Sequence, residues 1–276
     1  MVKNILFGLF IIATVSFVSC NHSNLNVRQE EEIETGKEVI DGQQNSFKSE
    51  VLLENEIVKI VSTGIDENSS EGSEIKVEIE NKIDKTIVVQ AMYTSVNNLM
   101  SQPMFMCELL PKEKATDSIV FFKDSIEELK NIEGFFSVFD KDGWETIGNY
   151  PFAALVDENS AGYNISDNGL VLIDNEAIKC IYTGQGEDNV FGPYIMLEIE
   201  NKIDDNVVAQ IREISVNGSM MDPLFISEIS AGKTSRNKVK FYEEDVNGFK
   251  DVEGKIHVFS GDTGDTIGDY PFSIIE

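Results

Sequence analysis

An internal duplication constrains the fold of this chain more than any other feature. The segment VEIENKIDKTIVVQ, which begins at Val77, returns 120 residues later as LEIENKIDDNVVAQ, which begins at Leu197. Residues 51–152 align with residues 171–272 without a gap, and 39 of the 102 pairs are identical. A period of 120 residues is far longer than the units of solenoids or propellers. The sequence therefore predicts a whole domain duplicated in tandem.

Alternation of apolar and charged residues predicts strands in both copies. Glu74–Glu80 alternates without exception, and Tyr194–Glu200 keeps the same inward set. A period of two is typical of a strand with one buried face. The other strands predicted in the first copy are Val51–Glu54, Ile57–Thr63, Thr86–Val96, Met104–Leu109, Ser118–Phe122, Gly134–Asp140 and Thr146–Ala153. Short strands separated by turn signals predict an all-β chain with one β-sandwich per copy, and only Ser125–Asn131 favours a short helix.

Polar connectors flank the two copies. Residues 21–50 are acidic and almost free of aromatic side chains, which is typical of a disordered tether. Residues 156–170 are rich in Gly, Asn, Ser and Asp and predict a short linker. The predicted organisation is a signal peptide over 1–19, a lipidated tether over 20–50, a first sandwich over 51–155, the linker, and a second sandwich over 171–276.

The N-terminus has the pattern of an export signal. Lys3 precedes an apolar run from Ile5 to Val18, which is too short to span a bilayer comfortably and suits a signal peptide. Cys20 follows a small residue and resembles the lipobox of bacterial lipoproteins, although Phe17 departs from the leucine usual there. This resemblance implies cleavage before Cys20 and a diacylglyceryl group on its thiol. Ordinary secretory cleavage or an uncleaved anchor are the alternatives.

Motifs along each copy resemble tandem immunoglobulin-like domains of unassigned function in exported lipoproteins of low-GC Gram-positive bacteria. The resemblance covers 51–155 and 171–276 and implies an immunoglobulin-like sandwich in each, but it implies no activity. The motifs that carry it in the first copy are Val58-Lys59-Ile60, Ile79-Glu80-Asn81-Lys82, Ser95-Val96-Asn97 and Ser137-Val138-Phe139-Asp140. The Cys–Trp–Cys spacing of antibody domains is absent.

Charge excludes some partners. The net charge is −27, and removal of residues 1–19 takes away Lys3 and makes it −28. Nucleic acid is not expected as a partner, because phosphate neutralisation needs a basic face. Attraction to anionic headgroups is not expected either, so we expect the membrane contact to come from the lipid on Cys20.

The sequence offers no catalytic set. Its two histidines are His22, in the tether, and His257, whose strand position predicts a side chain in solvent. No Ser/His/Asp or Cys/His arrangement and no nucleotide, zinc or redox motif can be assembled. Cys107 and Cys180 lie in different copies on faces expected in the core, which predicts two buried free thiols.

Calcium is the chemical hypothesis that the acidic loops suggest. Asp140, Asp142 and Glu145 lie on one tight loop, DKDGWET. If the strands follow immunoglobulin order, this loop shares an end of the sandwich with Asp66 and Glu67, which gives the oxygen ligands that Ca²⁺ prefers. An ordinary Asp-x-Asp-Gly turn is the alternative.

Trp144 is the only tryptophan and lies in the same loop, where the second copy has Gly264. It is a candidate anchor for a partner. The alternative is that it folds back onto the edge of the sandwich. Met100, Met104 and Met106 are apolar positions in both copies, which favours core packing over a binding patch.

The expected function is a cell-surface lipoprotein that acts as a non-catalytic binding or structural module. Its partner would be an envelope or host protein or polymer. The alternatives are an accessory subunit of an envelope transport or enzyme complex, a calcium-dependent adhesion module, and a hydrolase that uses surface carboxylates.

Overall fold

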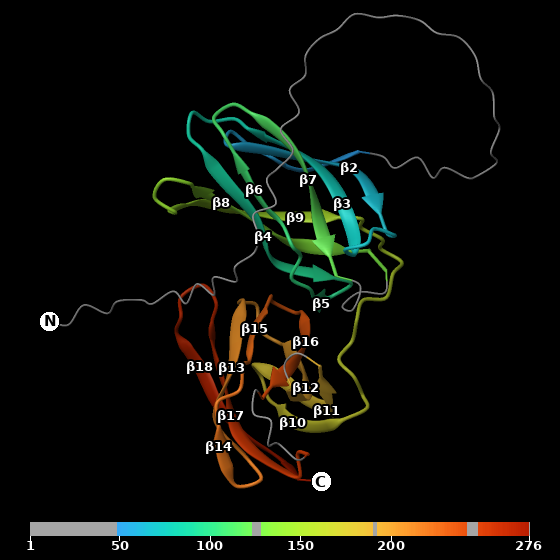
Figure 1. Cartoon of the computed structure of the whole chain (residues 1–276), viewed down its shortest axis with the longest axis vertical. Helices are drawn as coiled ribbons and strands as arrows, with labels where there is room; N and C mark the ends of the chain where they lie inside the picture. Colours follow the sequence, from blue (N-terminus) through green and yellow to red (C-terminus); the bar gives the residue numbers. More distant parts are fainter. Residues whose placement is uncertain (1–48, 123–127, 190–191, 242–247, 276) are drawn as a thin grey trace, which may run out of the picture.

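The structure is a computed structural model that describes residues 49–122, 128–189, 192–241 and 248–275. These residues form strands and connections without a helix, which confirms the all-β sandwich prediction (Figure 1). Glu128–Asn131, predicted as the end of a short helix, is irregular, and residues 123–127 lie outside the described ranges. The predicted signal peptide and most of the tether, including Cys20, also lie outside them.

The first copy consists of two antiparallel sheets. One has the order β1-β2-β3-β7, and in the other β4 pairs with β8, which pairs with β9, while β5 and β6 both pair with β4. The bounds are β1 Glu50–Glu54, β2 Val58–Asp66, β3 Ser73–Asn81, β4 Ile87–Val96, β5 Leu99–Met100, β6 Met106–Leu109, β7 Lys114–Phe121, β8 Ile132–Asp140 and β9 Thr146–Ala154.

The second copy repeats this order strand for strand. Its sheets are β10-β11-β12-β16 and β13-β17-β18, with β14 and β15 paired to β13. The bounds are β10 Leu170–Asp174, β11 Ile178–Asp188, β12 Gly192–Asn201, β13 Val207–Val216, β14 Ser219–Met221, β15 Ile226–Ile229, β16 Thr234–Lys240, β17 Asp251–Ser260 and β18 Thr266–Ile275.

Each copy buries its own apolar cluster between its two sheets. In β3 the alternate residues Ile75, Val77 and Ile79 are buried, as the period of two predicts. Phe136 stacks on Phe152 with ring centroids 4.1 Å apart. Full burial of a side chain of this size stabilises the fold by about 1.5–3 kcal/mol, so each cluster supports its own sandwich.

A buried asparagine explains why the ENKID segment is written twice. The Asn81 amide donates to the carbonyls of Lys85 at 2.8 Å, Leu109 at 3.2 Å and Leu110 at 2.9 Å. Asn201 repeats this with Asp205 at 2.8 Å and Ile229 at 3.1 Å. One side chain thus ties together the turns at one end of each sandwich.

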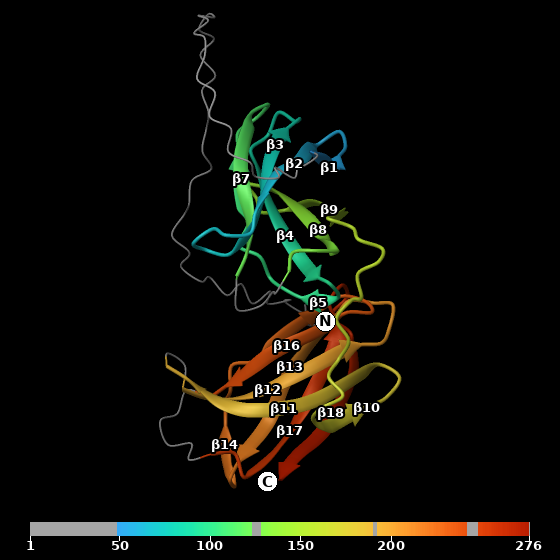
Figure 2. The same cartoon turned by 90° about the vertical axis from the view of Figure 1, so that its right-hand side faces the viewer.

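The two copies stack end to end (Figures 1 and 2). A single parallel bridge between Thr234 of β16 and Leu99 of β5 joins a sheet of the second copy to a sheet of the first. This junction decides which ends of the sandwiches are covered and which are free.

Candidate functional site

The two acidic loops predicted to form a calcium site lie at opposite ends of the first sandwich. Asp66 ends β2 beside the start of β3, at the far end from Asn81. Asp140 lies at the Asn81 end, where it pairs with Lys85. The nine residues of β3 separate these ends by roughly 26 Å, at about 3.3 Å per residue. The expectation that the loops share an end is wrong, because β2 and β3 follow each other in the same sheet.

The acidic side chains also have partners other than a cation. Asp140 accepts from the Lys85 ammonium at 2.6 Å and from the Asp142 N–H at 3.0 Å, and both donors lower the pKa of its carboxyl. Asp66 accepts from the Asn68 N–H at 3.1 Å and lies 3.7 Å from the Lys76 ammonium.

Glu67, Asp142 and Glu145 are exposed on these loops. Across the four described ranges, no group of three or more His, Cys, Asp or Glu residues is arranged to hold a metal ion.

Trp144 projects from the hairpin between β8 and β9 in a backbone conformation that favours glycine. Its φ is 53°, and the equivalent Gly264 has a φ of 76°. The indole is 49% exposed, and the Lys141 ammonium lies 5.1 Å from its ring centroid. A non-glycine residue in this region costs about 1–3 kcal/mol. The first copy therefore keeps an exposed aromatic side chain at a strained position where its sister copy has glycine.

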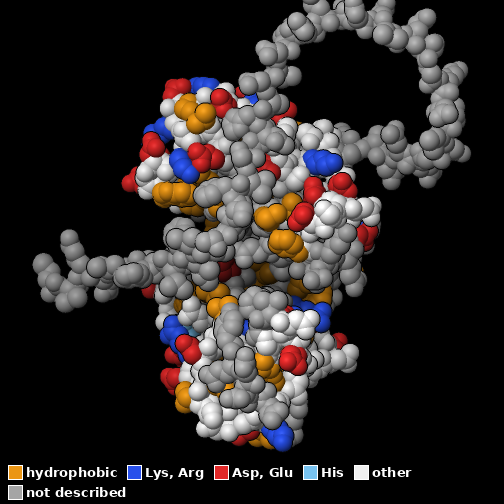
Figure 3. Space-filling model, viewed as in Figure 1, with side chains coloured by type: hydrophobic (Ala, Val, Ile, Leu, Met, Phe, Trp, Pro, Cys, Tyr) orange, Lys and Arg blue, Asp and Glu red, His pale blue; other side chains and the backbone are white. Residues whose placement is uncertain are grey.

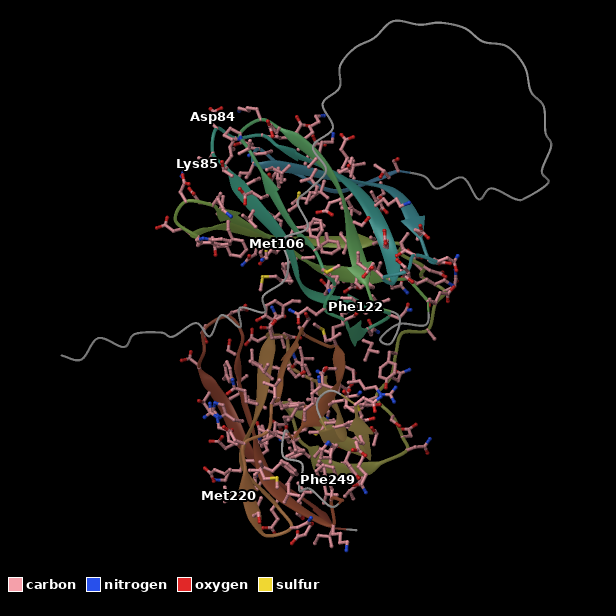
Figure 4. The ribbon with its side chains drawn as sticks, viewed as in Figure 1. Asp84, Lys85, Met106, Phe122, Met220 and Phe249 are labelled. Carbon is pink, nitrogen blue, oxygen red and sulfur yellow. The ribbon has the colours of Figure 1, made fainter. Side chains whose placement is uncertain are left out.

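Trp144 belongs to a surface that we call the outer end, made of the turns 82–86, 110–113 and 141–145 of the first copy. Lys141 pairs with Glu108 at 2.6 Å, and Leu110 is 46% exposed. Figure 4 shows Asp84 and Lys85 at this end, away from the second copy. Acidic, basic and apolar side chains are intermixed on the described surface of the first copy (Figure 3).

The equivalent end of the second copy binds a hairpin of the first. We call this the junction end; its turns are 202–206, 230–233 and 261–265. The hairpin Val96–Met100, the junction hairpin, docks on it. The Asn98 carbonyl accepts from the Thr234 N–H at 3.0 Å, and the Asn98 amide oxygen accepts from the Lys233 ammonium at 2.9 Å. Lys233 also pairs with Glu133 at 2.7 Å.

Apolar and aromatic side chains complete the junction. Met100 packs against the buried cluster of the second copy, and its sulfur accepts from the Ser230 N–H at 3.5 Å. The Tyr93 hydroxyl lies so close to Gly261 that a side chain there would approach it to 2.8 Å. Burial raises the pKa of Tyr93 to about 12, with the charges of Glu228 and Asp262 adding to the effect.

The linker is fastened to the same junction. The Tyr163 N–H donates to the Asn97 carbonyl at 2.5 Å, and the Ser166 N–H donates to the buried carboxylate of Glu198 at 2.8 Å. Burial and the hydrogen bond to Glu198 raise the pKa of the Tyr163 hydroxyl to about 12. Arg236 lies 3.6 Å from the other oxygen of Glu198.

Expectations for the cysteines and His257 have mixed outcomes. Cys180 is a buried free thiol, as predicted, and burial raises its pKa. Cys107 is buried but disulfide-bonded, so the predicted free thiol there is wrong.

His257 is 6% exposed and lies 2.7 Å from Asp269, so its predicted place in solvent is also wrong. Its strand, β17, lies between β13 and β18, and its ring lies beside that of Phe259 with centroids 5.5 Å apart.

The methionines do not fill the core as predicted. Met106 is 47% exposed, Met104 lies at the surface, and Met100 reaches the other copy. This role of Met100 was not predicted, because its counterpart Met220 is the same residue in the same motif. The sequence signal for the junction is a difference between the copies. At the positions that make contact, Lys233 replaces Glu113 and Gly261 replaces Lys141.

Comparisons with known proteins give no family. No protein-family model and no curated protein matches the sequence, so the immunoglobulin-like lipoprotein resemblance stays a prediction. Among solved structures, the YadV chaperone is 12% identical, covering 72% of this chain and 92% of its own, with a TM-score of 0.27. The Salmonella enterica SafA pilin in complex with the SafB chaperone is 11% identical, covering 80% and 98%, with a TM-score of 0.26. A Porphyromonas gingivalis W83 protein of unknown function is 10% identical, covering 73% and 89%, with a TM-score of 0.20. These scores carry no argument about function.

Within the described parts of the chain there is no helix with the length and apolarity needed to cross a membrane.

Proposed function

We propose that this protein is an exported, lipid-anchored, non-catalytic module of two immunoglobulin-like sandwiches that binds a protein through its outer end. The observation that carries the proposal is the junction. The same end of the same fold, in the second copy, holds a β-hairpin through backbone, ionic and apolar contacts.

The outer end differs from the junction end at the positions that make contact. Leu110, Glu113 and Lys141 stand where the junction end has Ser230, Lys233 and Gly261. These differences change the ligand that the end accepts. Leu110 is larger and more apolar than Ser230, Glu113 reverses the charge of Lys233, and Lys141 fills the space that Gly261 leaves open. These side chains fit a partner other than the junction hairpin.

Trp144 supplies the anchor of this surface. Tryptophan is enriched among the residues that dominate binding energy at protein interfaces. Its strained backbone lowers the stability of the fold, which supports a role outside folding because observed strain clusters at functional sites. The Lys141 ammonium lies over the ring, 5.1 Å from its centroid.

Lipid attachment at Cys20 and the tether over 20–50 complete the proposal. Because Cys180 is free and Cys107 is disulfide-bonded, this part requires that Cys107 bonds to a cysteine outside this chain and not to Cys20. The lipid would hold the chain at the membrane, and the tether would lift the sandwiches away from it. Intact mass of detergent-extracted protein is expected to show the loss of residues 1–19 and the gain of a diacylglyceryl group. A chain with the mass of ordinary secretory cleavage would contradict this part alone.

Intrinsic fluorescence tests the outer end directly, because Trp144 is the only tryptophan. Titration with fractionated envelope extract is expected to shift its emission to shorter wavelength as a partner covers the ring. Capture from the same extract is then compared between the immobilised wild type and Trp144→Gly, which has no tryptophan emission, restores the residue of the second copy and is expected to fold at least as well. Capture of one protein by the wild type and equally by Trp144→Gly would contradict the proposal.

Two of the alternative functions predict different results in this experiment. A subunit of an envelope complex would co-purify with its partner in a fixed ratio through washing, whereas a reversible binding module would not. A calcium-dependent adhesion module would show the spectral shift only when Ca²⁺ is present.

A further inference from the structure

We propose that the hairpin Val216–Met221 of the second copy, the free hairpin, docks onto the end of a β-sandwich domain in another protein, at a position where that domain presents a lysine. This surface lies at the opposite end of the molecule from the outer end (Figure 4, where Met220 is labelled). The inference does not depend on the partner of Trp144.

The free hairpin is built rigidly. Asn217 and Gly218 have φ values of 51° and 83°, and positive φ at both central residues is the mark of a tight two-residue hairpin turn. Asn217 fixes the turn to its base through four hydrogen bonds. Its N–H donates to the Asp251 carbonyl at 2.7 Å, its amide donates to the Gly248 carbonyl at 2.9 Å, and its amide oxygen accepts from the N–H groups of Lys250 and Asp251 at 3.1 and 3.2 Å. A preformed hairpin loses little conformational freedom on binding.

The first copy shows what such a hairpin does. Met100, near the tip of the junction hairpin, packs against the buried cluster of the next sandwich. Its equivalent, Met220, is 70% exposed. Leu99 forms the parallel bridge to Thr234, and its equivalent is Ser219, at the start of the short edge strand β14. The free hairpin therefore keeps the tight turn and the methionine of the junction hairpin, with Met220 in solvent, whereas Gly218 and Ser219 replace Asn98 and Leu99.

Charge identifies the kind of partner. At the junction, Glu133 pairs with Lys233. Its equivalent beside the free hairpin, Glu253, makes no ion pair with any residue that the structure describes. A sandwich end with a cation opposite Glu253 would complete the interaction.

The same geometry excludes a second copy of this chain as the partner of the free hairpin. If the free hairpin docked on the outer end of another molecule, Glu253 would face Glu113, which stands in the place of Lys233. Two carboxylates in that position repel each other. Leu110 also lacks the hydroxyl by which Ser230 donates to the Tyr93 carbonyl. The chain therefore does not stack head to tail on itself, and the occupant is a sandwich domain of a different protein.

A variant of the full-length mature chain can supply the missing partner surface. Leu110→Ser with Glu113→Lys gives the outer end the two residues of the junction end. We expect the wild type to remain monomeric in sedimentation velocity, and the double variant to form concentration-dependent, head-to-tail oligomers. Glu253→Lys alone, which restores opposite charges with the native Glu113, is expected to associate in the same way.

Two added substitutions identify the hairpin as the element that docks. Met220→Ser in the double variant is expected to weaken association at least tenfold, whereas Met106→Ser, another exposed methionine, is expected to leave it unchanged. Monomeric behaviour of both charge variants at the highest attainable concentration would overturn the proposal. So would association that survives Met220→Ser, or a wild type that already forms oligomers. Circular dichroism of each variant checks the fold, and all five substituted positions are exposed.

Discussion

The two copies share a strand order and a buried asparagine, yet they use their ends in different ways. The junction end of the second copy is covered by a hairpin, whereas the outer end of the first copy is exposed and carries Trp144. The junction hairpin reaches the next sandwich, whereas the free hairpin holds Met220 in solvent. The junction is thus a complete interface. The outer end and the free hairpin correspond to its two sides and lie at the two ends of the molecule.

The largest expected effect tests the feature that the copies share. Asn81→Ala and Asn201→Ala each leave buried carbonyls without a donor, which should cost about 2–3 kcal/mol in the free energy of unfolding. Asn81 bonds three carbonyls through its amide and Asn201 two, so Asn81→Ala should cost more. Urea unfolding measures both, with the exposed Asn68→Ala as control. Losses below about 0.5 kcal/mol would contradict the role of this side chain.

The second largest effect is expected from a substitution that disrupts the junction. Lys233→Glu gives the junction end the residue of the outer end and places two acids where Glu133 now meets a cation. The bridge is partly exposed, so we expect a cost of about 1–2 kcal/mol and a larger radius of gyration by small-angle scattering. Lys250→Glu, at an exposed site, is the control. An unchanged scattering profile would mean that the linker alone holds the copies together.

The junction should also weaken at high pH. The pKa of Tyr93 is raised from 10 to about 12, so above pH 10 the unfolded chain releases the phenolic proton first. The contribution of Tyr93 to the free energy of unfolding is therefore fully present below pH 10. It falls by about 1 kcal/mol as pH rises to 12, after allowance for solvent around the ring. Tyr93→Phe should remove this part of the dependence. Tyr163, raised to about 12 in the same way, contributes separately. Equal slopes for wild type and Tyr93→Phe would contradict the prediction.

Substitutions at Trp144 and at its equivalent Gly264 compare the hairpin loops of the two copies directly. Trp144→Gly should stabilise the first copy by about 1 kcal/mol, because glycine tolerates a φ of 53°. Gly264→Ala should destabilise the second copy by about the same amount, since its φ is 76°. Thermal unfolding should show shifts of about 4 °C in opposite directions. A lower melting temperature for Trp144→Gly would indicate that the indole stabilises the hairpin.

The smallest expected effect concerns calcium. Asp140 is held by Lys85, and the other predicted ligands, Asp66 and Glu67, lie at the opposite end of the sandwich. The melting temperature should be the same in EDTA and in millimolar Ca²⁺. A bound ion at a hundredfold its dissociation constant would add about 2.7 kcal/mol, so a rise specific to Ca²⁺ would be visible and would restore the adhesion hypothesis.

The predicted strands were accurate where the signal was local. The alternation in Glu74–Glu80 and the turn residues after it specify β3 and its end, since the pleat repeats every two residues. The same rule failed at His257, because alternation identifies two faces of a strand but does not show that both are covered. The predicted calcium site was wrong for a related reason. The prediction assumed immunoglobulin strand order, whereas β2 pairs with β3 within one sheet.

The sequence by itself determined that this protein is all-β, that its unit occurs twice, and which residues turn the chain at the end of β3 and β12. These properties depend on neighbours a few positions apart and on identical side chains in both copies. Only the tertiary structure decided which end of each sandwich is covered. Contacts such as Asn98 with Lys233 and Met100 with Ser230 join residues more than 120 positions apart. Because such pairs leave no periodic pattern, the different fates of Met100 and Met220 became visible only when the two copies were seen stacked.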